Sequence, residues 1–80
     1  MALQAEFTIE PFTEGSPGPH VVAALDVVDA SGLDSDFGPF GTTITGETED
    51  VIRTIAEVLD ASVAQGATRI SLQVSVPYSE

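Results

Sequence analysis

The sequence predicts an α+β domain whose elements follow in the order strand, helix, strand, strand, helix, strand. Three observations carry this prediction. Residues 3–10 and 68–76 alternate apolar and polar side chains, as strands with one buried face do. Residues 20–31 and 49–65 repeat apolar side chains at helical spacing. Glycine- and proline-containing stretches separate these segments.

The first part of the chain predicts one strand, one loop and one helix. The strand is expected at residues 3–10, and the segment PFTEGSPGP after it holds three prolines and two glycines, which is typical of a loop. Pro19 suits the first position of a helix, where its missing N–H leaves no hydrogen bond unmade. We expect this helix from about His20 to Ser31, with Gly32 as a left-handed C-cap. Its expected buried face comprises Val21, Val22, Leu25 and Val28.

The middle of the chain predicts two short strands and the second helix. The strands are expected at residues 34–38 and 42–47, joined by a turn around Gly38-Pro39. The helix is expected at residues 49–65, with Thr48 placed to cap its first turn. Its expected buried face comprises Val51, Ile52, Ile55, Val58, Leu59 and Val63.

The last strand, at residues 68–76, should bury the alternate apolar side chains Ile70, Leu72, Val74 and Val76. Because each helix and each strand has one apolar face, both helices should cover one face of a four-stranded antiparallel sheet. This arrangement is the ferredoxin-like β-α-β-β-α-β sandwich, in which the first and third strands are central. The polar residues expected on the other, open face are Gln4, Glu6, Thr8, Glu10, Thr43, Thr45, Ser71 and Gln73.

The charge balance limits the possible partners. Thirteen Asp and Glu residues stand against Arg53 and Arg69, which gives a formal net charge of −11. Nucleic acids and anionic membranes require Lys/Arg patches, so neither is an expected partner. A cationic or neutral small ligand is favoured instead, although an acidic surface also serves plain solubility.

Composition and the start of the chain predict where the protein works. No cysteine is present, so neither a disulfide nor a thiolate metal site is possible. The opening MALQAEFTIE lacks the basic and apolar segments of a signal peptide, and no apolar run is long enough to span a membrane. We expect residues 1–80 to form one soluble cytoplasmic domain.

No convincing catalytic set is present. His20 is the one histidine of the sequence, so one copy cannot build a multi-histidine metal site or a histidine-based relay. Its place behind Pro19 suits a solvated or capping side chain. Asp34 and Asp36 do not have the spacing of a calcium-binding loop, and no nucleophile lies beside a base. We therefore expect a protein that is not an enzyme and that uses no cofactor or metal.

The stretch PFGTTITGE, residues 39–47, concentrates two glycines and three threonines around one isoleucine. Glycine lets a ligand approach the backbone closely, as at Gly41 and Gly46, and threonine hydroxyls both donate and accept hydrogen bonds. We expect these threonines beside Glu6 and Thr8 on the open face, with a cation facing Glu6 or Glu47. The stretch equally suits a hairpin that serves only the fold, because threonine favours strands and glycine favours turns. The residues alone leave both interpretations open.

Five pieces of the sequence resemble the thiamine-binding protein family, the single-domain relatives of the YkoF-like proteins. They span nearly the whole domain in the family's order and are EFTIEPF, Gly15-Ser16, SGL at residues 31–33, PFGTTITGE and GATRISL from Gly66. The resemblance implies a ferredoxin-like fold, no known catalysis, and binding of thiamine or its hydroxymethylpyrimidine part. It also implies a homo-oligomer, a dimer or a tetramer, assembled through the sheets.

Matching the family's motifs by position extends the set of candidate residues. Phe40-Gly41-Thr42 corresponds to an apolar-Gly-Thr motif, Gly46-Glu47 to a Gly-acid pair, and Ser16 to a serine in the first loop. The chain departs from the family at Gly18-Pro19-His20, where many relatives have a second serine and an aromatic residue. The candidate ligand-binding residues are Glu6, Thr8, Ser16, Phe40, Gly41, Thr42, Thr43 and Glu47.

The chemistry of thiamine suits these residue types. Its permanent positive charge suits carboxylates, and its aminopyrimidine ring has donors and acceptors for hydroxyl and backbone groups. Two other functions stay open at this point. One is a cofactor-free ferredoxin-like enzyme, and the other is a purely structural or regulatory oligomerisation module.

Overall fold

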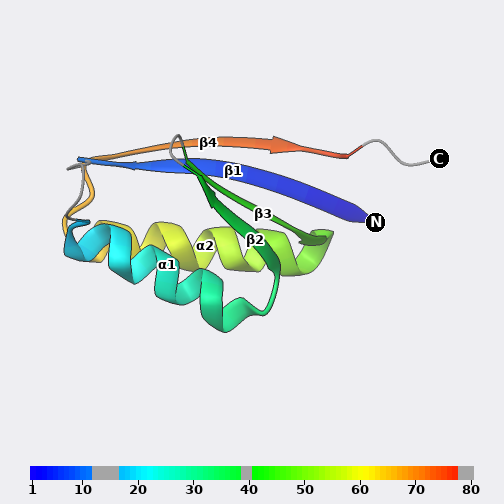
Figure 1. Cartoon of the computed structure of the whole chain (residues 1–80), viewed down its shortest axis with the longest axis horizontal. Helices are drawn as coiled ribbons and strands as arrows, with labels where there is room; N and C mark the ends of the chain where they lie inside the picture. Colours follow the sequence, from blue (N-terminus) through cyan, green and yellow to red (C-terminus); the bar gives the residue numbers. More distant parts are fainter. Residues whose placement is uncertain (12–16, 39–40, 78–80) are drawn as a thin grey trace.

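A computed structural model describes residues 1–11, 17–38 and 41–77 and gives the six elements in the predicted order (Figure 1). The fold class is therefore confirmed as a ferredoxin-like β-α-β-β-α-β sandwich. The bounds lie within one or two residues of those expected from the sequence, and the elements are β1 (Ala2–Glu10), α1 (Pro19–Ser31), β2 (Asp34–Gly38), β3 (Gly41–Glu47), α2 (Thr48–Ala64) and β4 (Arg69–Ser75).

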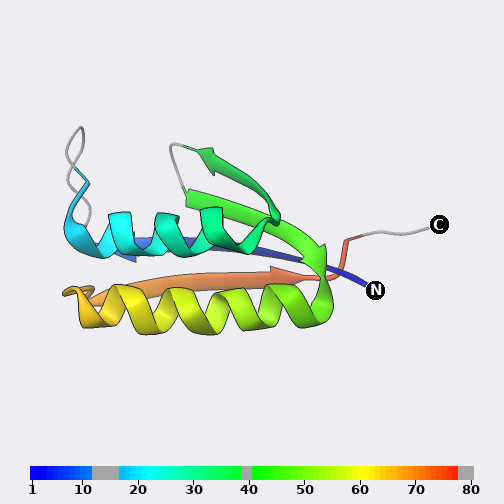
Figure 2. The same cartoon turned by 90° about the horizontal axis from the view of Figure 1, so that it is seen from below.

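The sheet has the strand order β2-β3-β1-β4, and all neighbouring strands are antiparallel. β1 and β3 are central, as predicted, and β2 and β4 are the edge strands. Both helices lie on one side of the sheet, and the view from below shows them side by side, with α2 along the β4 side (Figures 1 and 2). Within residues 1–11, 17–38 and 41–77, no element covers the opposite face of the sheet.

The buried core lies between the central strands and the helices. β1 contributes every second residue, because the strand alternates between the covered and the open face. β4 was expected to bury its apolar side chains in the same way, but Leu72, Val74 and Val76 are exposed and Ile70 is half-buried. That expectation was wrong for the edge strand, since the helices do not cover it fully. Among the described residues, the buried apolar side chains are Leu3, Ala5, Phe7, Ile9, Val21, Ala24, Val28, Ile44, Val51 and Val58.

The start of α1 is built around Gly18, Pro19 and His20. Pro19 occupies the first turn after an extended Gly18, whose carbonyl accepts a hydrogen bond from the N–H of Val21. The sequence suggested that His20 is solvated or caps the helix, and this expectation was wrong. His20 is buried, and its Nε2 donates to the carbonyl oxygen of Pro11. A Cβ on Gly18 would lie 2.7 Å from Cε1 of this imidazole. The absence of a side chain at Gly18 therefore leaves space for the His20 ring, whose hydrogen bond to Pro11 connects the start of α1 to the end of β1.

The covered face of α1 differs from the expectation at one position. Val21 and Val28 are buried as predicted, together with Ala24, and Leu25 is half-buried. Val22 was expected in the buried face but is exposed. It lies one residue, or about 100°, around the helix from Val21, which already faces the sheet.

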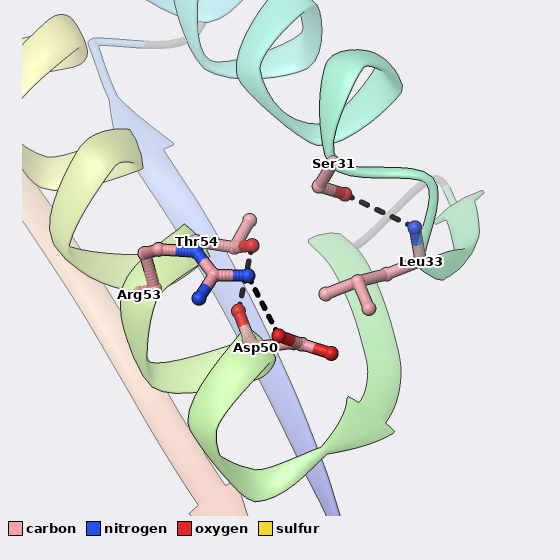
Figure 3. Close-up of polar contacts among 5 residues, drawn as sticks. All are labelled: Ser31, Leu33, Asp50, Arg53 and Thr54. Atoms are coloured by element: carbon pink, nitrogen blue, oxygen red, sulfur yellow. Dashed lines mark hydrogen bonds and ion pairs between the residues drawn. The ribbon is translucent and has the colours of Figure 1, made fainter.

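The end of α1 is closed by a left-handed glycine. Gly32 has a φ of 74°, which confirms the predicted C-cap. The hydroxyl of Ser31 donates to the carbonyl of Val28 (2.6 Å) and accepts from the N–H of Leu33 (3.1 Å; Figure 3). Leu33 then fills the space beside Gly46, where a Cβ would lie 2.6 Å from Cδ2 of the leucine. Gly46 thus admits a core side chain, and the expectation that it admits a ligand was wrong.

α2 begins without the side-chain cap expected from Thr48. The helix N-cap is Glu47, whose side chain makes no capping hydrogen bond. Thr48 lies in the first turn and bonds to the carbonyl of Met1 through both its hydroxyl (2.8 Å) and its N–H (2.9 Å). These two bonds connect the start of α2 to the first residue of the chain. Thr48 therefore makes a tertiary contact and does not cap the helix.

The buried face of α2 is rotated relative to the prediction. Val51 and Val58 are buried as expected and Ile55 is half-buried, but the other buried positions are Thr54 and Ser62. The hydroxyls of Thr54 and Ser62 donate to the helix's own carbonyls at Asp50 (2.8 Å; Figure 3) and Val58 (2.7 Å), which satisfies them without a partner element. The three residues expected to be buried but found exposed are Ile52, Leu59 and Val63.

Candidate functional site

The register between β1 and β3 separates the threonines of the PFGTTITGE stretch onto two faces. Thr43 lies opposite Glu6 on the open face, as expected. Thr42 lies opposite Phe7 and is only 5% exposed, so it faces the helices. The expectation that these threonines share the open face was wrong for Thr42. The sequence contained the signal for this position. Ile44 is the apolar residue of the strand and faces the core, and Thr42, two residues before it, must face the same way.

A cavity of about 400 Å³ opens between α1 and the ends of β1, β2 and β3. Its walls are mostly apolar, and the polar residues among those described in the lining are Thr8, Glu10 and Thr42. This size and mixture are typical of small-molecule sites. The described lining residues are Phe7, Thr8, Ile9, Glu10, Val21, Ala24, Leu25, Phe37, Gly38, Gly41 and Thr42.

The cavity brings together three of the candidate residues and leaves others apart. Thr8, Gly41 and Thr42 belong to its wall. Glu6 instead lines a smaller hollow of about 170 Å³ on the open face, which also includes Thr8, Ser71 and Gln73. Thr43, opposite Glu6, is on that open face as well.

The remaining candidates lie elsewhere. Glu47 is at the other end of β3, six residues from Gly41, which corresponds to about 20 Å along a strand. Its carboxylate is exposed and pairs with the amino terminus of Met1 at 3.0 Å. Ser16 and Phe40 lie outside the described residues. The structure thus separates Glu47 from the cavity.

Gly41 lets the start of β3 lie close to β1. Its φ is 157°, and a Cβ there would lie 3.0 Å from the carbonyl oxygen of Phe7 and 3.1 Å from Cγ2 of Thr8. A side chain would therefore press against β1. The absence of a side chain lets β3 begin pairing at the rim of the cavity, where the backbone of Gly41 is part of the wall.

Sequence reasoning missed several wall residues, of which Phe37 is the most informative. Phe37 lies opposite Thr42 in the β2–β3 register and is 59% exposed, because α1 does not extend over the edge strand. An exposed aromatic ring beside a buried hydroxyl is a surface on which a flat heterocycle can stack. The signal for it was present in the sequence, since Phe37 is the one large apolar residue of β2.

Glu10 is the acidic residue at the rim of the cavity. Among the described lining residues it is the one ionisable side chain, and its carboxylate lies 3.8 Å from the guanidinium nitrogen of Arg69 on β4. Both side chains are largely exposed, so this ion pair is screened by solvent. Glu10 was predicted on the open face but not as a ligand-binding residue.

The chemistry of this cavity suits binding. Within the described ranges, no group of three His, Cys, Asp or Glu side chains could hold a metal ion. The walls provide apolar surface and the side chain of Thr42, whereas Thr8 and Glu10 alternate with Phe7 and Ile9 along β1 and so belong to the rim of the cavity. This lining can hold a flat, partly polar molecule.

The fold and this cavity define a small ferredoxin-like protein, in which two helices cover one face of the sheet and the described residues form a cavity beside the central strands. The chain belongs to the thiamine-binding protein family, whose model matches residues 5–80. No match was found among the curated proteins. No helix in the described ranges has both the length and the apolar composition that a membrane crossing needs.

Solved structures support the same fold. A Thermotoga maritima protein, proposed to act in thiamine biosynthesis or salvage, is 24% identical with a TM-score of 0.71, over 99% of this chain and 85% of that one. A domain of unknown function from Bacillus cereus is 22% identical with a TM-score of 0.73, over 99% of this chain and 77% of that one. A Streptococcus pneumoniae protein is 17% identical with a TM-score of 0.76, over 100% of this chain and 89% of that one.

Proposed function

We propose that this protein binds thiamine or its hydroxymethylpyrimidine part in the cavity beside Thr42, without transforming it. The observation that carries the proposal is the cavity of about 400 Å³, whose wall contains Gly41 and Thr42 of the family's motif. Membership of the thiamine-binding protein family supports the class of ligand. The volume lies within the range of small-molecule sites.

The wall residues suggest how such a ligand is held. Phe37 offers a face for the pyrimidine ring, and the hydroxyl of Thr42 offers a hydrogen bond to one of its nitrogen atoms. Glu10 takes the role of counter-charge that the sequence had assigned to Glu6 or Glu47. It is the better placed of these acids because it lines the cavity.

The non-catalytic role is part of the same proposal, and the small number of titratable wall residues supports it. Enzymatic acid–base chemistry requires a titratable group within hydrogen-bonding reach of the reacting atoms, and Glu10 is the one such group among the described wall residues. The use of the bound ligand in salvage, transport or sensing, and a cytoplasmic location, are part of the proposal. The dimer or tetramer that the family resemblance implies stays a prediction.

Calorimetric titration tests the proposal with thiamine, thiamine monophosphate, thiamine pyrophosphate and hydroxymethylpyrimidine. We expect saturable binding of thiamine or hydroxymethylpyrimidine with one site per chain. The phosphate esters should bind no more tightly than thiamine, because the chain carries a net charge of −11. Absence of heat with all four compounds would favour the oligomerisation module, and turnover of any of them would favour the enzyme.

A further inference from the structure

The hydrogen bond between His20 and Pro11 joins two sides of the proposed ligand cavity. His20 precedes Val21, which lines the cavity from α1, and Pro11 follows Ile9 and Glu10, which belong to the lining from β1. The imidazole donates to the carbonyl oxygen of Pro11 and is only 8% exposed. His20 itself is not among the described lining residues. It acts on the cavity through the positions of its neighbours.

The two ends of α1 are joined to the sheet in different ways. At the end of the helix, only Gly32 and Leu33 separate it from β2, and Leu33 packs against the core. At its start, residues 11–18 separate it from β1. Eight residues can span up to roughly 28 Å, so the length of this connection does not fix where the helix begins. Among the hydrogen bonds of the described residues, the one between His20 and Pro11 is the one that joins α1 to the end of β1.

Both partners of this hydrogen bond are held in place by their neighbours. The carbonyl oxygen of Glu10 accepts from the N–H (2.8 Å) and the hydroxyl (3.3 Å) of Thr68, which fixes the chain just before Pro11. The imidazole of His20 lies against the backbone of Gly18, where a Cβ would come within 2.7 Å of Cε1. Because neither partner moves easily, the bond between them sets the distance from the start of α1 to the end of β1.

The cavity lies far from the short connection that joins α1 to β2. The two elements diverge from that connection (Figures 1 and 2). The lining includes Val21 and Leu25 from the first half of α1, and Phe37 and Gly38 from the end of β2. The position of the start of α1 therefore decides the width of the space between these walls. A shift of about 1 Å is enough to change the contacts of a bound molecule.

We infer that His20 is a positioning residue for the ligand site. Its hydrogen bond to Pro11 sets the position of the start of α1, and with it the width of the cavity. Gly18 acts together with His20, because a side chain at Gly18 would displace the ring. The effect on ligand affinity rests on the proposed function, whereas the effect on the position of α1 does not.

Three variants test this inference. His20→Leu removes the N–H donor and keeps an apolar side chain of similar size. His20→Gln keeps an N–H donor and should rescue the native behaviour. Val58→Ala is the control for lost stability, because this valine is 2% exposed but lies on α2, outside the described lining. Thermal denaturation followed by circular dichroism gives a temperature at which every variant is folded, and all measurements are made there.

Residual dipolar couplings of backbone amides in α1 and β1 report the orientation of the helix relative to the sheet without any ligand. We expect the native protein, His20→Gln and Val58→Ala to fit one orientation. His20→Leu should depart from it by more than the spread among the other three, because the start of α1 has lost its bond to Pro11. Couplings of His20→Leu that fit the native orientation would overturn the inference.

Calorimetric titration with thiamine and hydroxymethylpyrimidine measures the effect on the site. His20→Leu should lower the affinity for the compound that binds by at least about tenfold, while His20→Gln and Val58→Ala stay within about threefold of the native protein. A destabilised but folded chain keeps its affinity, so equal losses in His20→Leu and Val58→Ala would overturn the inference, as would native affinity in His20→Leu. If the native protein binds neither compound, the proposed function fails, and the dipolar couplings alone decide whether His20 positions α1.

Discussion

Thr42 lies opposite Phe7 in the antiparallel pairing of β1 and β3, on the side of the sheet that the helices cover. Its neighbour in the sequence, Thr43, lies opposite Glu6 on the open side. Two adjacent threonines of one short stretch therefore belong to two different surfaces. Only Thr42 belongs to the wall of the large cavity, and this separation makes the site testable with conservative substitutions.

Thr42→Val should weaken thiamine binding while leaving the fold intact. Valine keeps the shape of threonine but removes the hydroxyl, so a polar group of the ligand loses its partner at a cost of about 1 kcal/mol or more. Calorimetry should then show affinity lower by about fivefold or more. Thr43→Val, on the open face, is the matched control and should bind as the native protein does. Loss of affinity in Thr43→Val alone would place the ligand on the open face.

Phe37→Ala should weaken ligand binding with little effect on stability. The ring is 59% exposed, so its removal should change the free energy of unfolding by less than about 1 kcal/mol. Loss of a stacking face should lower the affinity by about 0.5–1.5 kcal/mol. Val76→Ala has the same exposed fraction in the native protein but lies beyond β4, and it should leave the affinity unchanged. Equal effects of the two substitutions on binding would contradict a role for Phe37 as a wall of the site.

Gly41→Ala should destabilise the protein more than Gly38→Ala. A methyl group at Gly41 meets the carbonyl oxygen of Phe7 at 3.0 Å, whereas one at Gly38 meets its closest atom at 3.4 Å, an ordinary contact. Overpacking at the first site should cost about 1–3 kcal/mol, which lowers the Tm by several degrees in a domain of this size. Thermal denaturation followed by circular dichroism measures both. Similar Tm values for the two variants would show that β1 and β3 adjust without strain.

Salt should stabilise this protein. The net charge of −11 makes the folded chain repel itself, and the described ion pairs, all between largely exposed side chains, are worth little in return. Raising sodium chloride from about 0.02 M to about 0.5 M shortens the Debye length and should raise the Tm by a few degrees. Potassium chloride at equal ionic strength should give the same rise. A Tm that falls with salt would mean that the ion pairs outweigh the repulsion.

The sequence by itself determined the order of the elements, their approximate bounds and the fold class. Local chemistry carries these features: the period-two alternation of β1, the left-handed glycine at position 32 and the proline at the start of α1 each act within a few residues. The family resemblance likewise rested on short pieces in a fixed order, and the family match over residues 5–80 confirmed it.

Only the tertiary structure decided which faces these elements present. Strand pairing placed Thr42 in the cavity wall, and packing against α1 turned Thr54 inward and Ile52 outward on α2. The joining of Phe37, Glu10 and Thr42 in one cavity depends on three strands brought together by the fold. The physical reason is that periodicity fixes which side chains share a face, whereas contacts between distant segments fix where that face points.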